Sequence, residues 1–439
     1  MEGRHIFNPE AETMARDELL QLQLERLQAT LNRAMRNIAW YRERFAPLDF
    51  VPDGVRSLED LARLPLTSRT DMAEGYPYGF LAVPLREVVR IDTAPGLTCD
   101  PAVVAYTRND LAHWAELAAR VMTAAGINAD SVVQIPFETG MFDAGFGFVG
   151  GAHLIGASVI SVPGGDYRKQ VRVMRDYRST VLVAMPSDAL HLAAELEQMN
   201  VGPRGLWLQT ALLGGEPWPE PTRAEVQERL GVQALDNYGV RVAAWPGLAA
   251  ECEQRAGLHI NEDFFLAEVV DPDTLEPLPP GAEGELVITT LEKEALPLIR
   301  YRTGDVCSLS VEPCACGRSF ARMSRPWRRT DDTIVVRGIT IQPGAIADTV
   351  EGLVGASTEH ELVVGGQAFD DVEIRVAVPA QRAGTEQGLM ALARMRGDLE
   401  RELAAVLGLP VRIAVVERSS LTGDDGVARA AVDLRGGGG

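Results

Sequence analysis

The sequence predicts an α/β protein in which a large N-terminal domain, with mainly parallel sheets and a β-rich subdomain, precedes a small α+β C-terminal domain. The chain has 439 residues, which is too long for one typical domain. Helical segments alternate with Val- and Ile-rich strand segments from Tyr106 onward. Beyond Leu235 short strands separated by turns dominate, and a new α+β pattern follows. These changes predict domains at residues 1–332 and 333–439.

The N-terminal part begins with an amphipathic helical pattern and continues with alternating elements. Over residues 17–45, apolar side chains from Leu20 to Tyr41 recur at helical spacing. Further helices are expected at 107–125, 145–155 and 168–177, and strands at 131–135, 158–162 and 180–184. Because helices separate these successive strands, the pattern indicates a mainly parallel sheet that is covered on both faces.

The rest of the chain is expected to contain the β-rich subdomain and the C-terminal domain. Strands are predicted at 266–270, 285–290 and 306–311. The C-terminal unit is predicted to contain strands at 333–337, 361–364, 372–378 and 411–416 and helices at 344–354 and 386–407. A unit of about 100 residues is large enough to form a domain.

Composition and charge argue against several classes of protein. The formal net charge is −20, which disfavours nucleic-acid binding because no compensating basic patch is found. No apolar run of about 18 residues predicts a membrane span, and the first residues lack the pattern of a signal peptide. We therefore expect a cytoplasmic globular protein that binds neither nucleic acid nor membrane.

Several motifs resemble, in order, the phenylacetate-CoA ligase branch of the adenylate-forming superfamily. They lie at residues 64–71, 106–111, 214–218, 296–305 and 331–343. The resemblance implies the adenylate-forming enzyme fold, with a large N-terminal domain and a mobile C-terminal domain. It also implies a two-step reaction, in which a carboxylate attacks ATP to form an acyl-adenylate and the CoA thiolate then displaces AMP.

The same resemblance implies the residues of a nucleotide site. Asp305 corresponds to the carboxylate that holds the ribose hydroxyls, and the other positions lie beside or stack on adenine. Together these positions are Gly214, Gly215, Glu216, Tyr238, Gly239 and Asp305. The alternative is that Asp305 caps a turn and that the two glycines only allow tight packing.

Three positions depart from the family pattern. Asp100 stands where the phosphate loop has a lysine, Val242 where a glutamate helps to hold Mg²⁺, and Val427 where the adenylation lysine is expected. A reversed charge repels phosphate, and valine offers a hard cation no oxygen ligand. Arg241 would supply a positive charge without Mg²⁺, or it is a solvated arginine. These departures predict weak binding of ATP with Mg²⁺.

Two pairs of metal-binding residue types lie in the β-rich part. A tetrahedral Cys₃His set would hold a structural Zn²⁺. Its members would be Cys252, His259, Cys314 and Cys316. The alternative is four unlinked residues, because the Cys-x-Cys spacing is tighter than the usual Cys-x-x-Cys.

An acyl pocket is expected from the resemblance after the strand at 131–135. Its apolar wall would be Phe137, Met141, Phe142 and Phe146, or these are ordinary core residues. Glu138 and Asp143 are unusual in such a place and would act as a general base or bind a substrate amine. The alternative is that both carboxylates face solvent.

The function expected from these residues is acyl transfer or condensation on a bound aryl or acyl group, without ordinary ATP-dependent adenylation, in specialised metabolism. The acyl group would arrive on CoA or on a carrier. One alternative is a conventional ATP-dependent aryl-CoA ligase with unusual phosphate contacts. Another is a non-catalytic partner of a related ligase or carrier protein. The oligomeric state, a homodimer included, stays open.

Overall fold

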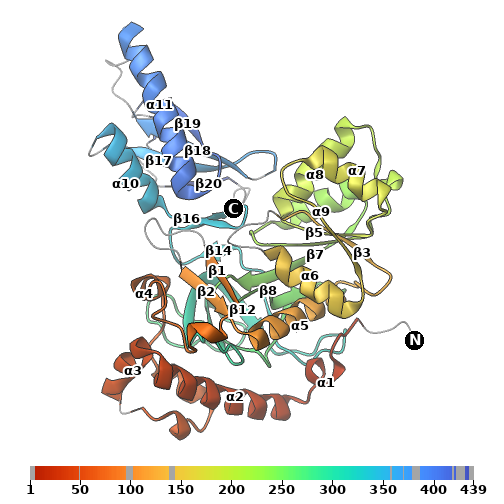
Figure 1. The fold of residues 1–439 in the computed structure, drawn as a ribbon, viewed down its shortest axis with the longest axis vertical. Helices are drawn as coiled ribbons and strands as arrows, with labels where there is room; N and C mark the ends of the chain where they lie inside the picture. The colour runs from red at the N-terminus through yellow and green to blue at the C-terminus, as the bar shows by residue number, and fades with distance from the viewer. Residues whose placement is uncertain are drawn as a thin grey trace. The chain divides into compact units, whose positions relative to one another are not determined.

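The structure is a computed structural model, and it divides the chain into two compact units (Figure 1). It describes residues 5–48, 50–94, 102–137, 144–355, 358–368, 370–377, 386–417, 420–421 and 431–434. The larger unit ends at Thr330 and the smaller begins at Asp331, while residues 186–190 group with the smaller unit. The boundary predicted from the sequence lies between residues 332 and 333.

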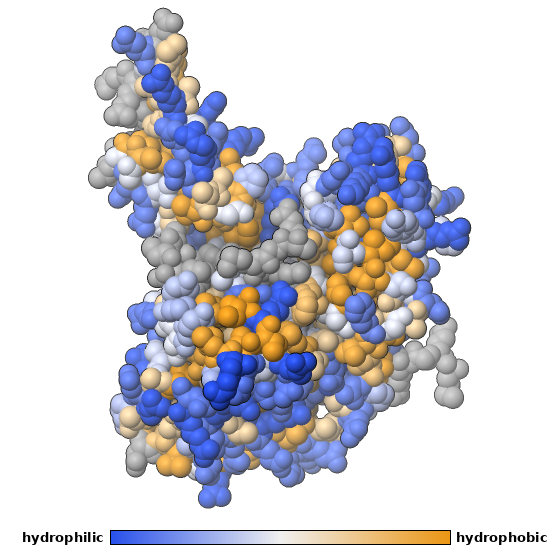
Figure 2. Space-filling view, viewed as in Figure 1, coloured by the Kyte–Doolittle hydropathy of each residue, from blue (hydrophilic) through white to orange (hydrophobic). Residues whose placement is uncertain are grey.

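The N-terminal helices form where the amphipathic pattern predicts them. They are α1 (Pro9–Glu12), α2 (Arg16–Asn37), α3 (Ala39–Phe45) and α4 (Arg69–Glu74). Leu27 and Leu31 on α2 and Tyr41 on α3 are fully buried, so one face of each helix enters the core. In Figure 2 the surface over α2 and α3 is largely hydrophilic, as expected for the opposite faces.

One mixed sheet organises the larger unit. Its strand order is β10-β11-β12-β13-β9-β8-β7-β6-β5-β3-β4, with β14 paired to β12. The strands from β4 to β7 are parallel. They are β3 (Val132–Ile135), β4 (Ser158–Ser161), β5 (Val181–Ala184), β6 (Thr210–Gly214) and β7 (Gln233–Val240). The associated helices are α5 (Arg108–Ala124), α6 (Ala144–Ile155), α7 (Tyr167–Asp176), α8 (Pro186–Gln198) and α9 (Glu220–Leu230).

The β-rich part continues this sheet with antiparallel strands. They are β8 (Ala244–Glu251), β9 (Leu258–Ile260), β10 (Phe265–Val270), β11 (Glu283–Thr290), β12 (Tyr301–Ser310), β13 (Arg322–Met323) and β14 (Arg328–Arg329). The antiparallel half begins at β8, because the chain reverses directly after β7. The expected strand at 306–311 is longer than predicted and begins at Tyr301, within the 296–305 motif.

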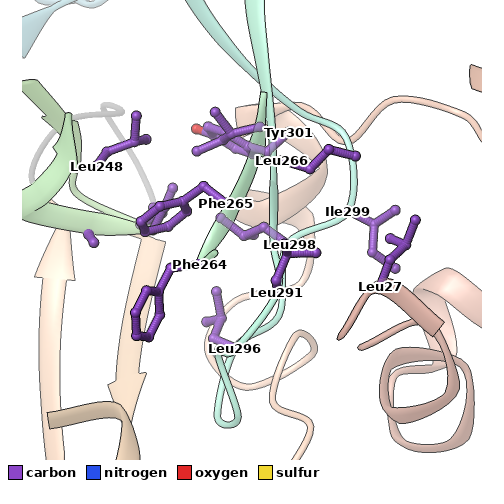
Figure 3. Packing of buried hydrophobic residues seen from close by; sticks show 14 of the residues in the cluster. Leu27, Leu248, Phe264, Phe265, Leu266, Leu291, Leu296, Leu298, Ile299 and Tyr301 are labelled. Atoms are coloured by element: carbon purple, nitrogen blue, oxygen red, sulfur yellow. The ribbon is translucent and has the colours of Figure 1, made fainter. Parts of the chain in front are cut away.

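The core of this half packs against the N-terminal helices. Figure 3 shows Phe265 and Leu266 of β10 with Leu298 and Ile299 of the segment before β12. Leu27 of α2 lies beside Ile299 in the same view and belongs to the same buried cluster. The 296–305 motif therefore begins as a buried apolar segment before it turns polar.

A short antiparallel pair, β1 (Arg90–Ala94) and β2 (Ala102–Tyr106), completes the strands of the larger unit. The smaller unit has a two-stranded pair and a second sheet in the order β19-β18-β17-β20. Its elements are β15 (Ile334–Val336), β16 (Ile339–Ile341), α10 (Pro343–Val354), β17 (His360–Gly365), β18 (Asp371–Ala377), α11 (Glu386–Leu407), β19 (Arg412–Val416) and β20 (Ala431–Asp433). The sequence did not predict β16 and β20, which are only three residues long.

Within the residues that the structure describes, no helix has the length and apolar character needed to span a membrane.

Candidate active site

Two of the family-like motifs pack against each other and fix the start of β12. The Thr67 N–H donates to the Arg300 carbonyl (2.9 Å), and the Arg302 N–H donates to the Thr67 carbonyl (2.9 Å). The buried Tyr41 hydroxyl accepts from the Ile299 N–H (3.0 Å). These backbone bonds hold the 64–71 segment along the 296–305 segment, so both enter the site in fixed register.

Asp305 follows a glycine whose left-handed backbone conformation few other residues adopt easily. Gly304 has φ of 75°, and its N–H donates to Glu285 Oε1 (3.1 Å). The side chain of Asp305 accepts from the Tyr238 hydroxyl, with Oη 2.6 Å from Oδ2. Arg329, its register partner on β14, forms an ion pair with the other carboxylate oxygen. The Asp305 carboxylate is thus held in one orientation and stays partly accessible, with 19% of its side chain exposed.

Burial keeps the Tyr238 hydroxyl a donor. Burial first, and then the negative charge of Asp305, raise the pKa of Tyr238 well above its ordinary value. A protonated phenol donates its hydrogen to Asp305 and leaves the ring face for stacking.

The loop after β6 lies beside Tyr238 at the carboxyl ends of the parallel strands. Gly214 is the register partner of Asn237, and an added Cβ there would lie 2.3 Å from the Asn237 carbonyl oxygen. Gly215 has φ of +87°. Asn237 Nδ2 donates to the Leu213 carbonyl (2.7 Å), while Asn237 Oδ1 is buried without a partner among the described residues. Ligands in open α/β sheets bind at this edge, so the loop and Asp305 mark a candidate ligand site.

Two arginines bring positive charge to the chain just after β7. Burial, and next the nearby Arg69 at the start of α4, lower the pKa of Arg241. Burial is the larger cause and the second cation adds to it, because both disfavour the charged form of the guanidinium. Val242, one residue later, is 5% exposed and belongs to the main hydrophobic core.

Two of the aromatic residues predicted to line the acyl pocket are described, and each packs with different neighbours. Phe137 is buried and packs edge-to-face on Trp245 with ring centroids 5.7 Å apart. An added Cβ at Gly215 would lie 2.5 Å from Trp245 Cζ2, so this indole lies against the glycine loop. Phe146 is 39% exposed, and the Arg90 guanidinium lies 4.2 Å from its ring centroid. Phe137 and Phe146 therefore belong to different aromatic groups.

Lys293 is a buried cation that motif reasoning did not single out. Its Nζ donates to the Ala243 carbonyl (3.0 Å) and lies 4.1 Å from the Tyr106 ring centroid. Burial lowers the pKa of Lys293 to about 8, although Asp110 and Asp92 act in the opposite direction. The only available signal was its rarity, because the chain has two lysines.

Sequence reasoning also missed Arg69, Arg329, Asn237 and Trp245. Arg329 lies two residues before the Asp331–Asp332 pair of a recognised motif, and Asn237 directly precedes Tyr238. Extending each motif by one or two residues would have found both. Trp245 and Arg69 reach the site through tertiary packing, which sequence spacing does not reveal.

The Cys–His set predicted from the sequence comes together in the larger unit. The ligand atoms of Cys252, His259, Cys314 and Cys316 all lie within 4.8 Å of one another. Six other predicted positions lie outside the described residues. They are Asp100, Glu138, Met141, Phe142, Asp143 and Val427.

Asp305, held by Tyr238 and Arg329 near the glycine loop, lies at the position that the resemblance to adenylate-forming enzymes gives to the ribose-binding carboxylate. The sequence model of the AMP-binding enzyme family matches residues 96–291. The chain resembles the solved 2-hydroxyisobutyryl-CoA ligase in complex with 2-HIB-AMP and CoA in its thioesterification state. The TM-score is 0.89 at 25% identity, over 98% of this chain and 92% of that one. The predicted fold class is therefore confirmed.

Curated proteins that match the chain over nearly its whole length identify the branch of the superfamily. The chain is 38% identical over 443 residues to a phenylacetate-coenzyme A ligase of Thermus thermophilus, covering 98% of this chain and 100% of that protein. It is 37% identical to one from Pseudomonas putida, over 98% of each chain, and 35% identical to one from Escherichia coli, over 97% of each. The chain belongs to the phenylacetate-CoA ligase-like family of adenylate-forming enzymes, as its motifs predicted.

The expectation of acyl transfer or condensation without ATP-dependent adenylation is wrong. Relatives this similar over their whole length are named CoA ligases, and the solved neighbour holds an adenylate with CoA. That expectation rested on the departures at Asp100, Val242 and Val427, with Arg241 as the replacement positive charge. Arg69 lies near Arg241, which directly follows β7, and Mg²⁺ is commonly held by substrate phosphates and water with few protein carboxylates.

Proposed function

We propose that this chain catalyses ATP-dependent formation of a CoA thioester from an aryl or other apolar carboxylic acid. The substrate carboxylate attacks the α-phosphorus of ATP, which forms a mixed anhydride with AMP and releases pyrophosphate. The thiolate of CoA then attacks the acyl carbon and AMP leaves. The observation that carries the proposal is the Asp305 carboxylate, fixed by Tyr238 and Arg329 at the carboxyl edge of the sheet.

The described residues fit the nucleoside part of ATP. Asp305 has acceptor capacity beyond its bonds to Tyr238 and Arg329, which suits the two hydroxyls of a ribose. Asn237 Oδ1, the buried acceptor beside the glycine loop, suits an amino donor such as that of adenine. The ring of Tyr238 would stack on the base.

The phosphate part would be held mainly by guanidinium charge. Burial first, and then the nearby Arg69, lower the pKa of Arg241, and a phosphate group near both guanidinium groups would be attracted to their positive charge. Position 242 provides no metal ligand, because Val242 lies in the apolar core. Mg²⁺ would therefore arrive on the phosphates and keep water ligands. It would neutralise charge on the leaving pyrophosphate.

The acyl group would lie against the aromatic side chains near the glycine loop. Phe137 and Trp245 are described there, and Met141, Phe142 and the carboxylates Glu138 and Asp143 belong to the same proposal. The named relatives act on phenylacetate and the structural neighbour on 2-hydroxyisobutyrate. An indole beside Gly215 favours a compact, flat acid, because it fills space at the loop.

The proposal has several further parts. Residues 333–439 would be the mobile domain that completes each half-reaction. CoA is the proposed acceptor, and an acyl carrier protein is the alternative thiol. A homodimer, a cytoplasmic location and a Zn²⁺ ion at the Cys–His set are also proposed.

The test is product analysis with the full chain. It is incubated with ATP, Mg²⁺, CoA and a panel of arylacetic, benzoic and short hydroxy acids, and AMP and thioester masses are quantified. We expect AMP and the acyl-CoA mass in equal amounts for at least one flat aromatic acid. Absence of AMP and thioester with every acid, while a parallel phenylacetate-CoA ligase turns over, would refute the proposal.

A further inference from the structure

We infer that Cys252, His259, Cys314 and Cys316 bind one structural Zn²⁺ ion in a closed tetrahedral site. This inference goes beyond the proposed reaction and does not depend on it. Cys252 directly follows β8, and His259 lies on β9. Cys314 and Cys316 lie in the turn between β12 and β13. All four residues belong to the larger unit.

Two of the distances between ligand atoms match a tetrahedral metal site. With Zn–S of about 2.3 Å and Zn–N of about 2.0–2.1 Å, tetrahedral geometry separates two sulfurs by about 3.8 Å and a sulfur from a nitrogen by about 3.5 Å. Cys252 Sγ and Cys314 Sγ are 3.8 Å apart. Cys316 Sγ and His259 Nε2 are 3.4 Å apart. These two independent pairs have the spacing that a shared central ion imposes.

The other ring nitrogen of His259 has the partner that a metal-bound histidine needs. Its Nδ1 lies 3.3 Å from the Phe320 carbonyl oxygen, which can accept a hydrogen bond from Nδ1–H. This bond selects the tautomer in which Nε2 has a free lone pair directed at Cys316. The ring is therefore oriented for ligation, which favours the Cys₃His set over the alternative of four unlinked residues.

The chemistry of the set selects the ion and the role. Three thiolates and one imidazole favour Zn²⁺ over hard cations such as Mg²⁺. Cys252, His259 and Cys316 are at most 5% exposed, and four protein ligands leave no position for water. The competing arrangement is a disulfide, which would need an S–S distance of about 2.05 Å, and Cys252 and Cys314 are free thiols.

A bound ion would join two connections of the sheet. One connection is the turn from β8 to β9, and the other is the turn from β12 to β13. β9 pairs with both β8 and β13, so the ion would lock strands that already neighbour one another. β8 pairs in turn with β7, the strand that carries Tyr238. The expected consequence of metal loss is lower stability of this half of the sheet.

Metal content and metal-dependent melting of the full chain test the inference. The protein is purified under reducing conditions without an affinity tag that binds metal, and zinc is measured by plasma mass spectrometry. Cys314→Ala removes the most accessible ligand, and Cys307→Ala removes a buried thiol on β12 that is outside the set. We expect one Zn²⁺ per chain in the wild type and in Cys307→Ala. In Cys314→Ala, Zn²⁺ binding should weaken at least about tenfold.

A second measurement covers the case in which Cys314→Ala does not fold. The wild-type protein is stripped with a chelator and titrated with Co²⁺, whose tetrahedral thiolate complexes absorb strongly in the visible range. A saturable spectrum at one equivalent, abolished by Zn²⁺, supports the site, as does a melting midpoint that falls on chelation and recovers with Zn²⁺. Wild-type protein that contains no metal, gives no cobalt spectrum and melts independently of Zn²⁺ would overturn the inference.

Discussion

Tyr238 and Val242 lie close together in sequence at the end of β7, and their environments are opposite. The Tyr238 hydroxyl is bonded to Asp305, on a strand that lies elsewhere in the sheet order. Val242 is embedded in apolar side chains, and only Arg241 between them brings a charge. The ribose end of the proposed site therefore depends on particular groups in fixed geometry.

The phosphate end of the site follows a different rule. Charge neutralisation requires positive charge at the right distance, and several residue types can provide it. A carboxylate that binds two hydroxyls must have one orientation, so a residue at another position in the sequence cannot easily replace it. Under the proposed function, this difference would explain why Asp305 and Tyr238 match the family motifs while Asp100, Val242 and Val427 depart from them.

The largest effect is expected for Asp305→Asn. The amide keeps the size of the side chain but loses the charge that pairs with Arg329 and accepts from the ribose. We expect kcat/KM for ATP to fall by about 10²- to 10³-fold, since a charged hydrogen-bonded contact contributes about 3–4 kcal/mol in such a site. Asp271→Asn, in an exposed turn, is the control. A fall of less than threefold would remove Asp305 from the site.

Val242→Glu tests whether position 242 belongs to the apolar core. A carboxylate at a position 5% exposed lacks a described partner in the core, so the variant should lose about 3 kcal/mol of unfolding free energy. Val242→Gln introduces a side chain of the same shape as glutamate but without its charge, so comparing the two variants separates the effect of charge from the effect of volume. Urea unfolding of both variants gives the difference. Unchanged stability together with faster Mg²⁺–ATP turnover would show that this position can still hold the metal.

The sequence predicted much of the fold because the signals were local. Helical spacing from Leu20 to Tyr41 and the alternation after Tyr106 depend on nearest neighbours, and both appear in the structure. The β-rich part was expected as a separate subdomain, but it extends the same sheet, because sheet order is set by long-range pairing. Asp305 was identified from its motif, whereas its partner Arg329 depends on the pairing of β12 with β14.

Arg241→Met should have a smaller effect than loss of Asp305. Removing one of two neighbouring guanidinium groups leaves Arg69, so we expect about tenfold higher KM for ATP with a modest fall in kcat. Arg241→Lys keeps the charge and should recover part of the loss. Steady-state kinetics at saturating acid measure both. If Arg241→Met has the wild-type KM for ATP, Arg241 has no role at the phosphates.

Lys293 gives the smallest effect and a defined pH dependence. Its folded-state pKa is about 8 and the ordinary value is 10.5, so between these values the unfolded chain binds more protons than the folded chain. The contribution of Lys293 to the free energy of unfolding therefore rises between pH 8 and pH 10.5 and is lowest below pH 8. Relative to Lys293→Met, wild-type unfolding free energy should rise by about 1 kcal/mol from pH 8 to pH 9. A parallel pH dependence of both proteins would show that the Lys293 pKa is not lowered.

Acid-dependent exchange of labelled pyrophosphate into ATP, measured without CoA, isolates the first half-reaction and tests the central claim most directly. The account predicts exchange that requires both an apolar carboxylic acid and Mg²⁺ and that disappears in Asp305→Asn. Folded wild-type protein that shows no exchange with any acid of the panel would contradict it.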